Sequence, residues 1–93
     1  MPQVRIPPVL RSVAAGNRSV AVEATTVRGA LQALVAQYPA LESRVLEGDG
    51  VPSFLNVFVD GEDVRLLQGL DTEVSESSTV LLLPAVAGGS VRR

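Results

Sequence analysis

The residues with the clearest chemical potential are two adjacent glycines, Gly88 and Gly89, followed only by Ser90-Val91-Arg92-Arg93 in the printed sequence. Glycine has no Cβ and loses much conformational entropy when it is fixed, so this pair contributes little to a packed core. It does form a thin strip of backbone that can enter a narrow channel in a partner enzyme. Such a strip suits chemistry at a main-chain carboxyl group, although the Gly89 carboxyl group is not yet free in this sequence.

Side-chain chemistry points away from an independent enzyme. The chain contains no Cys and no His, which removes thiolate nucleophiles, disulfides and the commonest general base and metal ligand. The acidic residues Asp60, Glu62 and Asp63 lack the ligand spacing of a calcium loop, so they favour a solvated turn. We therefore expect no bound metal, no permanently bound cofactor and no catalytic residue, and a protein on which other enzymes act.

Composition indicates one soluble domain. The chain has 93 residues, 46% of them hydrophobic, and a net charge of -2 in which every basic residue is Arg. No apolar run approaches the ~20 residues that a membrane span requires, and the start of the sequence lacks a signal-peptide pattern. We expect a cytoplasmic protein that binds neither membrane nor nucleic acid, because no basic face is evident. The acidic balance favours a protein partner with a basic docking surface.

The first part of the chain predicts a β-hairpin. Val4 and Ile6 alternate with polar residues, and a second alternating segment follows the Gly16-Asn17 turn signal. Pro7-Pro8 should stop regular strand pairing, after which Val9 and Leu10 are expected to resume it.

Residues 27–38 predict the main helix. Val27, Leu31, Leu34 and further apolar residues fall at helical spacing, with Thr25 or Thr26 as the cap and Pro39 as the stop. A close approach to a sheet would compensate for Gly29 inside this helix. Leu41 and Val45 indicate a short helical turn on the same core.

The second part of the chain predicts two or three more strands. Residues 54–59 form one, Asp60-Gly61 makes a hairpin turn, and a polar turn at 75–79 precedes the last strand. Leu66, Leu67 and Leu70 are expected to tuck under the sheet. This order predicts an α+β fold of the β-grasp, ubiquitin-like type: a mixed four- to five-stranded sheet with one main helix packed on one face, formed by residues 1–87, and a flexible tail of residues 88–93.

Strand alternation predicts an exposed apolar patch. If Val80 and Leu82 point into the core, Leu81 and Leu83 point to the opposite face, and the same reasoning places Phe58 there. A patch of Phe58, Leu81 and Leu83, extended by Pro84 and Val86, is typical of a protein-docking surface. The alternative is a slipped register in which Leu81 or Leu83 belongs to the core. A Phe58→Asp substitution is expected to leave the fold intact and to weaken activation by the partner enzyme.

Several segments resemble the sulfur-carrier branch of the ubiquitin-like family, which includes the small subunit of molybdopterin synthase and the thiamin sulfur carrier. They are Thr26-Val27, Tyr38-Pro39, residues 54–65, and Leu82-Leu83-Pro84-Ala85-Val86-Ala87-Gly88-Gly89. The stretch from Asn56 to Arg65 and the ending through Gly89 look most similar to the carrier of thiocarboxylate-dependent cysteine biosynthesis. The Ser75-Glu76-Ser77-Ser78 turn departs from the family's acidic-Gly-acidic pattern.

The resemblance implies a function. A ubiquitin-activating-type adenylyltransferase and sulfurtransferase would use ATP to adenylate the Gly89 carboxylate and convert it to a thiocarboxylate. A pyridoxal-phosphate-dependent, cysteine-synthase-like enzyme would then accept the sulfur. Alternatives are a small subunit of molybdopterin synthase, a carrier for thiamin or a specialised metabolite, a protein modifier attached to lysines, and an interaction module with an inert tail.

Family members that extend beyond Gly-Gly are precursors that need trimming. The resemblance therefore implies a processing site between Gly89 and Ser90, cut by a zinc metalloprotease of the deubiquitinase-like kind. Arg92 and Arg93 would help an acidic protease recognise the end. The alternative is a frayed solvated end or a remnant of cloning.

Overall fold

A five-stranded mixed sheet forms the frame of the computed structural model, which describes residues 1–48 and 50–84. Its strand order is β2-β1-β5-β3-β4. The strands are β1 (Gln3–Arg5), β2 (Ser19–Ala21), β3 (Leu55–Val59), β4 (Glu62–Asp63) and β5 (Thr79–Pro84). The central strand β5 runs parallel to β1 and antiparallel to β3, so the sheet is mixed, as predicted.

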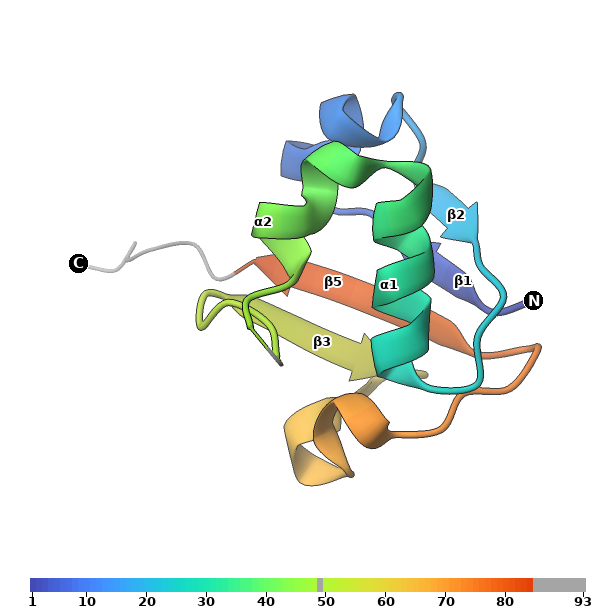
Figure 1. Ribbon diagram of the computed structural model, residues 1–93. Coiled ribbons are helices and arrows are strands. Elements are labelled where there is room, and N and C mark those ends of the chain that lie inside the picture. The colour runs from blue at the N-terminus through green and yellow to red at the C-terminus, as the bar shows by residue number, and fades with distance from the viewer. Residues whose placement is uncertain (49, 85–93) are drawn as a thin grey trace.

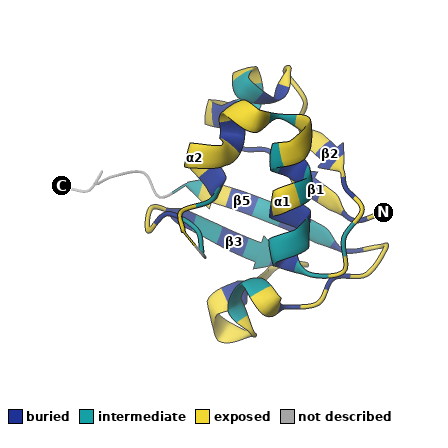
Figure 2. Ribbon diagram, in the orientation of Figure 1, coloured by how far each residue is buried: buried dark blue, intermediate teal, exposed yellow. Residues whose placement is uncertain are grey.

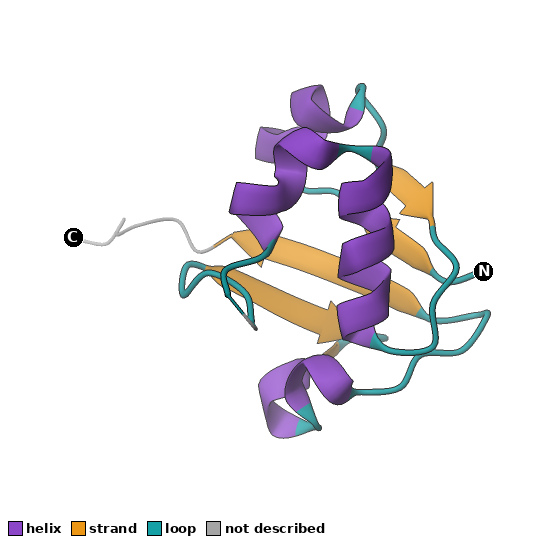
Figure 3. Ribbon diagram, in the orientation of Figure 1, coloured by secondary structure: helices purple, strands orange, loops and turns teal. Residues whose placement is uncertain are grey.

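The helices cover one face of this sheet. The main helix α1 (Val27–Gln37) crosses it, and the shorter α2 (Glu42–Val45) lies beside α1 (Figure 1). Four 3-10 helices connect these elements: η1 (Pro8–Ala14), η2 (Pro39–Leu41), η3 (Val64–Leu66) and η4 (Gly69–Asp71) (Figure 3). The predicted β-grasp architecture, with one main helix packed on one face, is confirmed.

Aliphatic side chains from the sheet and from α1 make the core. Val4, Val80 and Leu82 of the sheet are fully buried, as are Leu31 and Leu34 of α1. Along β3 and β5 buried residues alternate with less buried ones (Figure 2). Leu41 and Val45 are also fully buried, so the predicted short turn after Pro39 packs on the same core.

The segment after β1 differs from the prediction. Val9 and Leu10 do not resume a strand; they belong to η1, which has Pro8 in its first turn. Proline fixes φ near the helical value and its missing N–H is not needed at that position, so Pro8 starts a helical turn as readily as it stops a strand. Leu10 is buried, whereas Val9 is 69% exposed.

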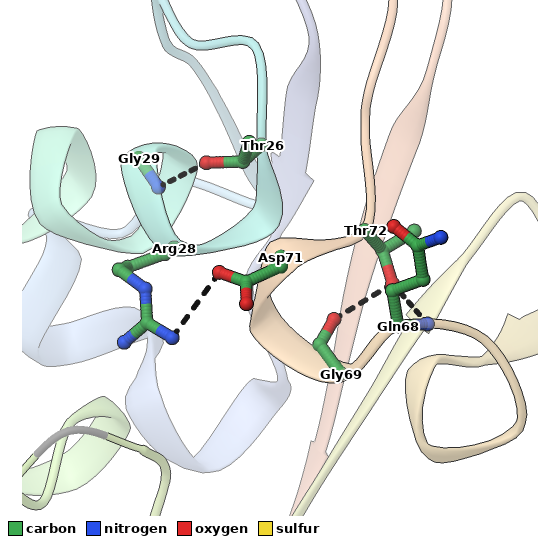
Figure 4. Close-up of polar contacts among 7 residues, drawn as sticks. All are labelled: Thr26, Arg28, Gly29, Gln68, Gly69, Asp71 and Thr72. Atoms are coloured by element: carbon green, nitrogen blue, oxygen red, sulfur yellow. Dashed lines mark hydrogen bonds and ion pairs between the residues drawn. The ribbon is translucent and has the colours of Figure 1, made fainter.

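Thr26 begins α1 as predicted. Its side-chain oxygen accepts a hydrogen bond of 3.1 Å from the backbone N–H of Gly29 (Figure 4). A close approach to the sheet, one possible compensation for Gly29, is not what the structure shows. A Cβ at Gly29 would meet only Ala24 and the Thr26 hydroxyl, both at 3.4 Å, so no packing constraint requires glycine there.

The segment between η3 and β5 is tied to the start of α1. The backbone N–H of Val27 donates to the carbonyl of Thr72, and Arg28 pairs with Asp71 at 3.4 Å. The buried Thr72 hydroxyl donates to the Gly69 carbonyl at 2.7 Å and accepts from the Gln68 N–H at 3.0 Å (Figure 4). Backbone and hydroxyl hydrogen bonds therefore hold this segment together with the packing of Leu70 and Val74 against the core.

Two of the three leucines predicted to lie under the sheet are on the surface. Leu66 is 83% exposed and Leu67 is exposed as well, while Leu70 packs partly against the core. Val64 occupies the core position of η3 instead.

None of the helices in the described part of the chain has the length and apolarity that a membrane crossing requires.

Candidate functional site

The face of the sheet that α1 leaves uncovered carries the predicted docking residues. We call it the outer face. Residues directly opposite in an antiparallel pair project to the same side; Phe58 faces Leu81, and Asn56 faces Leu83. Their neighbours Val57, Val80 and Leu82 are buried. The predicted alternation is therefore confirmed, and the slipped register is excluded.

Phe58, Leu81 and Leu83 form one apolar patch on the outer face. Leu83 is 43% exposed, and Phe58 and Leu81 are half-buried. Leu81 and Leu83 are two residues apart on β5, and Phe58 lies beside the first and diagonal to the second, within side-chain reach of both. Pro84 is half-buried and lies opposite the buried Leu55, so it projects to the core side of the sheet and does not extend the patch on the outer face.

Two residues beside this patch were not singled out from the sequence. Arg5 of β1 lies next to Leu81 in the parallel register and is exposed. Phe54 is 48% exposed and immediately precedes β3. Alternation continued backwards from Phe58 and Asn56 could have indicated Phe54. The position of Arg5 beside the patch could be found only from the pairing between β1 and β5, which joins residues more than seventy positions apart.

A charged pair borders the patch on the β4 side. Asp63 lies directly opposite Phe58. Its carboxylate accepts three side-chain hydrogen bonds from Arg65: two from Nε, at 3.1 and 3.2 Å, and one from Nη2, at 2.6 Å. It also accepts from the Arg65 backbone N–H at 2.8 Å. These bonds hold the pKa of Asp63 below its ordinary value and raise the pKa of Arg65.

The acidic turn is occupied by structural contacts. Asp60 and Gly61 have φ values of 51° and 90°, as a tight hairpin turn requires. The Asp60 carboxylate accepts a 2.9 Å hydrogen bond from the Thr79 backbone N–H, and Asp63 binds Arg65. Residues 1–48 and 50–84 contain no group of three His, Cys, Asp or Glu residues that could hold a metal ion.

The predicted reactive and processing residues lie beyond Pro84. Val86, Gly88, Gly89 and Ser90 are outside the described residues. The structure does describe the strand that leads to them: β5 pairs with β1 from Thr79 to Leu81 and with β3 from Val80 to Pro84. Gly89 follows Pro84 by five residues, which span at most ~18 Å when fully extended. The central strand β5 therefore leads within five residues of sequence to Gly88-Gly89, which Ser90-Val91-Arg92-Arg93 follow.

The architecture defines a class of protein. A β-grasp sheet with an uncovered apolar patch, whose central last strand leads to Gly-Gly, is of the ubiquitin-like type. A model of the ThiS family matches residues 4–89, and the chain belongs to the ThiS family.

Named relatives of two kinds are similar to this chain. Sulfur carrier protein CysO of Mycobacterium tuberculosis is 35% identical over 89 residues, which cover 92% of this chain and 96% of its own. A chain in the crystal structure of the Amycolatopsis orientalis BexX/CysO complex superposes with a TM-score of 0.89 at 35% identity, covering 96% of this chain and all of that one. Small archaeal modifier protein 1 of Haloferax volcanii is 39% identical over 79 residues, covering 81% and 86%.

Proposed function

We propose that this chain is a cytoplasmic sulfur carrier protein rather than an enzyme. After removal of residues 90–93, the Gly89 carboxylate would be adenylated and converted to a thiocarboxylate. This thiocarboxylate would then donate its sulfur, and the pathway that we propose for it is cysteine biosynthesis. The observation that carries the proposal is the placement of β5, the central strand between β1 and β3, from which five further residues reach Gly89. The sulfur-carrier relatives support it over most of their length.

The chemistry explains why a carrier needs an activating enzyme. A carboxylate resists attack by a sulfur nucleophile until one oxygen becomes part of a leaving group. The activating enzyme joins the Gly89 carboxylate to the AMP part of ATP and releases pyrophosphate. A sulfur nucleophile then attacks the carbonyl carbon and displaces AMP, which leaves a thiocarboxylate. The carrier supplies the carbon atom and the docking surface, consistent with its lack of Cys and His.

The proposed partners follow from these steps. An adenylyltransferase and sulfurtransferase would bind the apolar patch together with Pro84 and Val86. A pyridoxal-phosphate-dependent, cysteine-synthase-like enzyme would receive the sulfur, and a metalloprotease would cut between Gly89 and Ser90. A role as the small subunit of molybdopterin synthase, or as a carrier for thiamin or a specialised metabolite, needs the same surface and the same terminus.

The second candidate function is that of a protein modifier. The similarity to small archaeal modifier protein 1 favours it. A modifier forms an amide between Gly89 and an amine of another protein. This chain has no Lys, so its own α-amino group is its only amine and branched chains of this protein could not form through its side chains.

Mass spectrometry distinguishes these functions. The protein is isolated from its native host, and its intact mass is compared with that of a chain encoded to end at Gly89. A sulfur carrier is expected to end at Gly89 and to gain the mass difference between sulfur and oxygen when sulfide, ATP and the activating enzyme are present. Gly89 joined to lysines of other proteins would indicate the modifier. Recovery of only the full-length, unmodified chain from active cells would contradict both.

A further inference from the structure

The charge on the outer face is opposite in sign to the charge of the whole chain. The strand residues that project to this face are Gln3, Arg5, Ser19, Ala21, Asn56, Phe58, Asp63, Thr79, Leu81 and Leu83. The one carboxylate among these residues is Asp63, and Arg65 neutralises it through short hydrogen bonds. Among these described strand residues one uncompensated charge therefore remains, the positive charge of Arg5, on a chain of net charge -2.

Arg5 is placed to act on a docked partner. It lies beside Leu81, so it stands at the edge of the apolar patch opposite the edge that carries Asp63. Its side chain is exposed, and within residues 1–48 and 50–84 no carboxylate forms an ion pair with it. A guanidinium group offers a planar set of donors that matches a carboxylate, and this pairing strengthens when an apolar contact beside it excludes water.

We propose that the outer face binds an activating enzyme whose own apolar patch is flanked by a carboxylate opposite Arg5. This inference rests on the proposed sulfur-carrier function and adds the polar element that orients the docked partner. The net charge alone favours a basic partner surface, but the local charges favour an acidic one at this site. Because Asp63 already engages Arg65, Arg5 is the residue on this face that selects for the acidic group.

The test compares two charge reversals that change the net charge equally. Arg5→Glu reverses the charge on the outer face. Arg44→Glu reverses an exposed charge on α2, on the helix-covered side of the sheet (Figure 1). Each variant is made in the chain that ends at Gly89. ATP–pyrophosphate exchange by the activating enzyme purified from the host is measured against carrier concentration, at low and at high salt.

Arg5→Glu is expected to raise the half-saturating carrier concentration about tenfold at low salt and less at high salt. Arg44→Glu should match the wild type at both salt concentrations, and Arg5→Lys should recover part of the loss. Equal effects of Arg5→Glu and Arg44→Glu would overturn the inference while leaving the carrier function in place. Absence of exchange with the wild-type carrier would contradict the proposed function, and the inference with it. Thermal melts check that Arg5→Glu, an exposed substitution, remains folded.

Discussion

Asp63 of β4 lies directly opposite Phe58 of β3 in the antiparallel register. This pairing changes the expected result of Phe58→Asp, which the sequence alone suggested would leave the fold intact. The new carboxylate would face Asp63 and would replace a half-buried ring. A carboxylate at this half-buried position loses the packing of the ring and adds a second negative charge where Arg65 balances only that of Asp63. We expect Phe58→Asp to lower the free energy of unfolding by about 1–2 kcal/mol, measured by urea titration; an unchanged midpoint would contradict this prediction.

Leu83→Ser tests the apolar patch with less disturbance of the fold. Leu83 is 43% exposed and faces the uncharged Asn56, so its replacement leaves no buried charge. The loss of a central apolar contact is expected to raise the half-saturating carrier concentration in pyrophosphate exchange about tenfold. Because no charge changes, the effect should be the same at low and high salt, unlike that of Arg5→Glu.

Leu66→Ser is the matched control for Leu83→Ser. Leu66 is 83% exposed and belongs to η3, outside the outer-face strands. Leu66→Ser removes the same kind of side chain from a more exposed position, so the kinetics of pyrophosphate exchange should stay at the wild-type level. If both serine variants impair exchange equally, the partner does not distinguish the apolar patch from the rest of the surface.

Gly29→Ala is expected to stabilise the protein. Gly29 lies in the first turn of α1, and an added Cβ would make contacts no shorter than 3.4 Å. Alanine lowers the conformational entropy of the unfolded chain and has a higher helix propensity than glycine. The free energy of unfolding is therefore expected to rise by about 0.5–1 kcal/mol. Thermal or urea unfolding measures it. Gly61→Ala provides the contrast, because φ at Gly61 is 90°, and should cost about 1 kcal/mol or more. A lower stability of Gly29→Ala would show a constraint on Gly29 that its surroundings do not reveal.

Asp60 is expected to tolerate Asn and to reject Ala. The backbone N–H of Asp60 donates to the Thr79 carbonyl at 3.0 Å, and its carboxylate accepts from the Thr79 N–H at 2.9 Å. An Asn side chain keeps an acceptor and is tolerated at the observed φ of 51°. Asp60→Ala loses the acceptor and strains the backbone, at a combined cost of about 1–2 kcal/mol in unfolding free energy. Equal stability of the two variants would rule out this hydrogen bond as a stabilising contact.

The Asp63–Arg65 pair gives a pH dependence of known sign. Hydrogen bonds from Arg65 place the pKa of Asp63 below its ordinary value in the folded protein. The stabilisation of the folded protein by this pair is therefore fully present above the pKa that Asp63 has in the unfolded chain. It is lost as pH falls through the lower pKa that Asp63 has in the folded protein. An NMR titration of the Asp63 carboxyl carbon should show this low pKa, and Arg65→Gln should raise it toward the ordinary value. An identical Asp63 titration in both proteins would refute the assignment to Arg65.

Local patterns predicted the features that depend on neighbouring residues. The helical spacing from Val27, the Asp60-Gly61 turn and the alternation along β5 were each visible in a few residues, and they were enough to place Leu81, Leu83 and Phe58 on one face. The patterns were insufficient where two outcomes share one local signal. Pro7-Pro8 is compatible with a strand stop or a helix start, and the start of η1 was settled by packing of Leu10 into the core.

Features that depend on distant partners were not predictable in the same way. Leu66 and Leu67 have the composition of a core segment, but Val64 already fills that position and leaves them outside. Arg5 had no distinguishing neighbours in the sequence. Its importance comes from lying beside Leu81, a contact that exists only once the first and last strands pair.

The parallel pairing of β1 with β5 also decides how the protein can be handled. Gln3 lies beside Thr79, so both strands begin at the same edge of the molecule, and Pro84 lies five residues further along β5. At the rise per residue of a β-strand, Pro84 therefore lies roughly 17 Å from the edge at which Gln3 and Thr79 lie. An affinity handle fused ahead of Met1 would emerge at the edge remote from Pro84, leaving the reactive end accessible on an immobilised carrier.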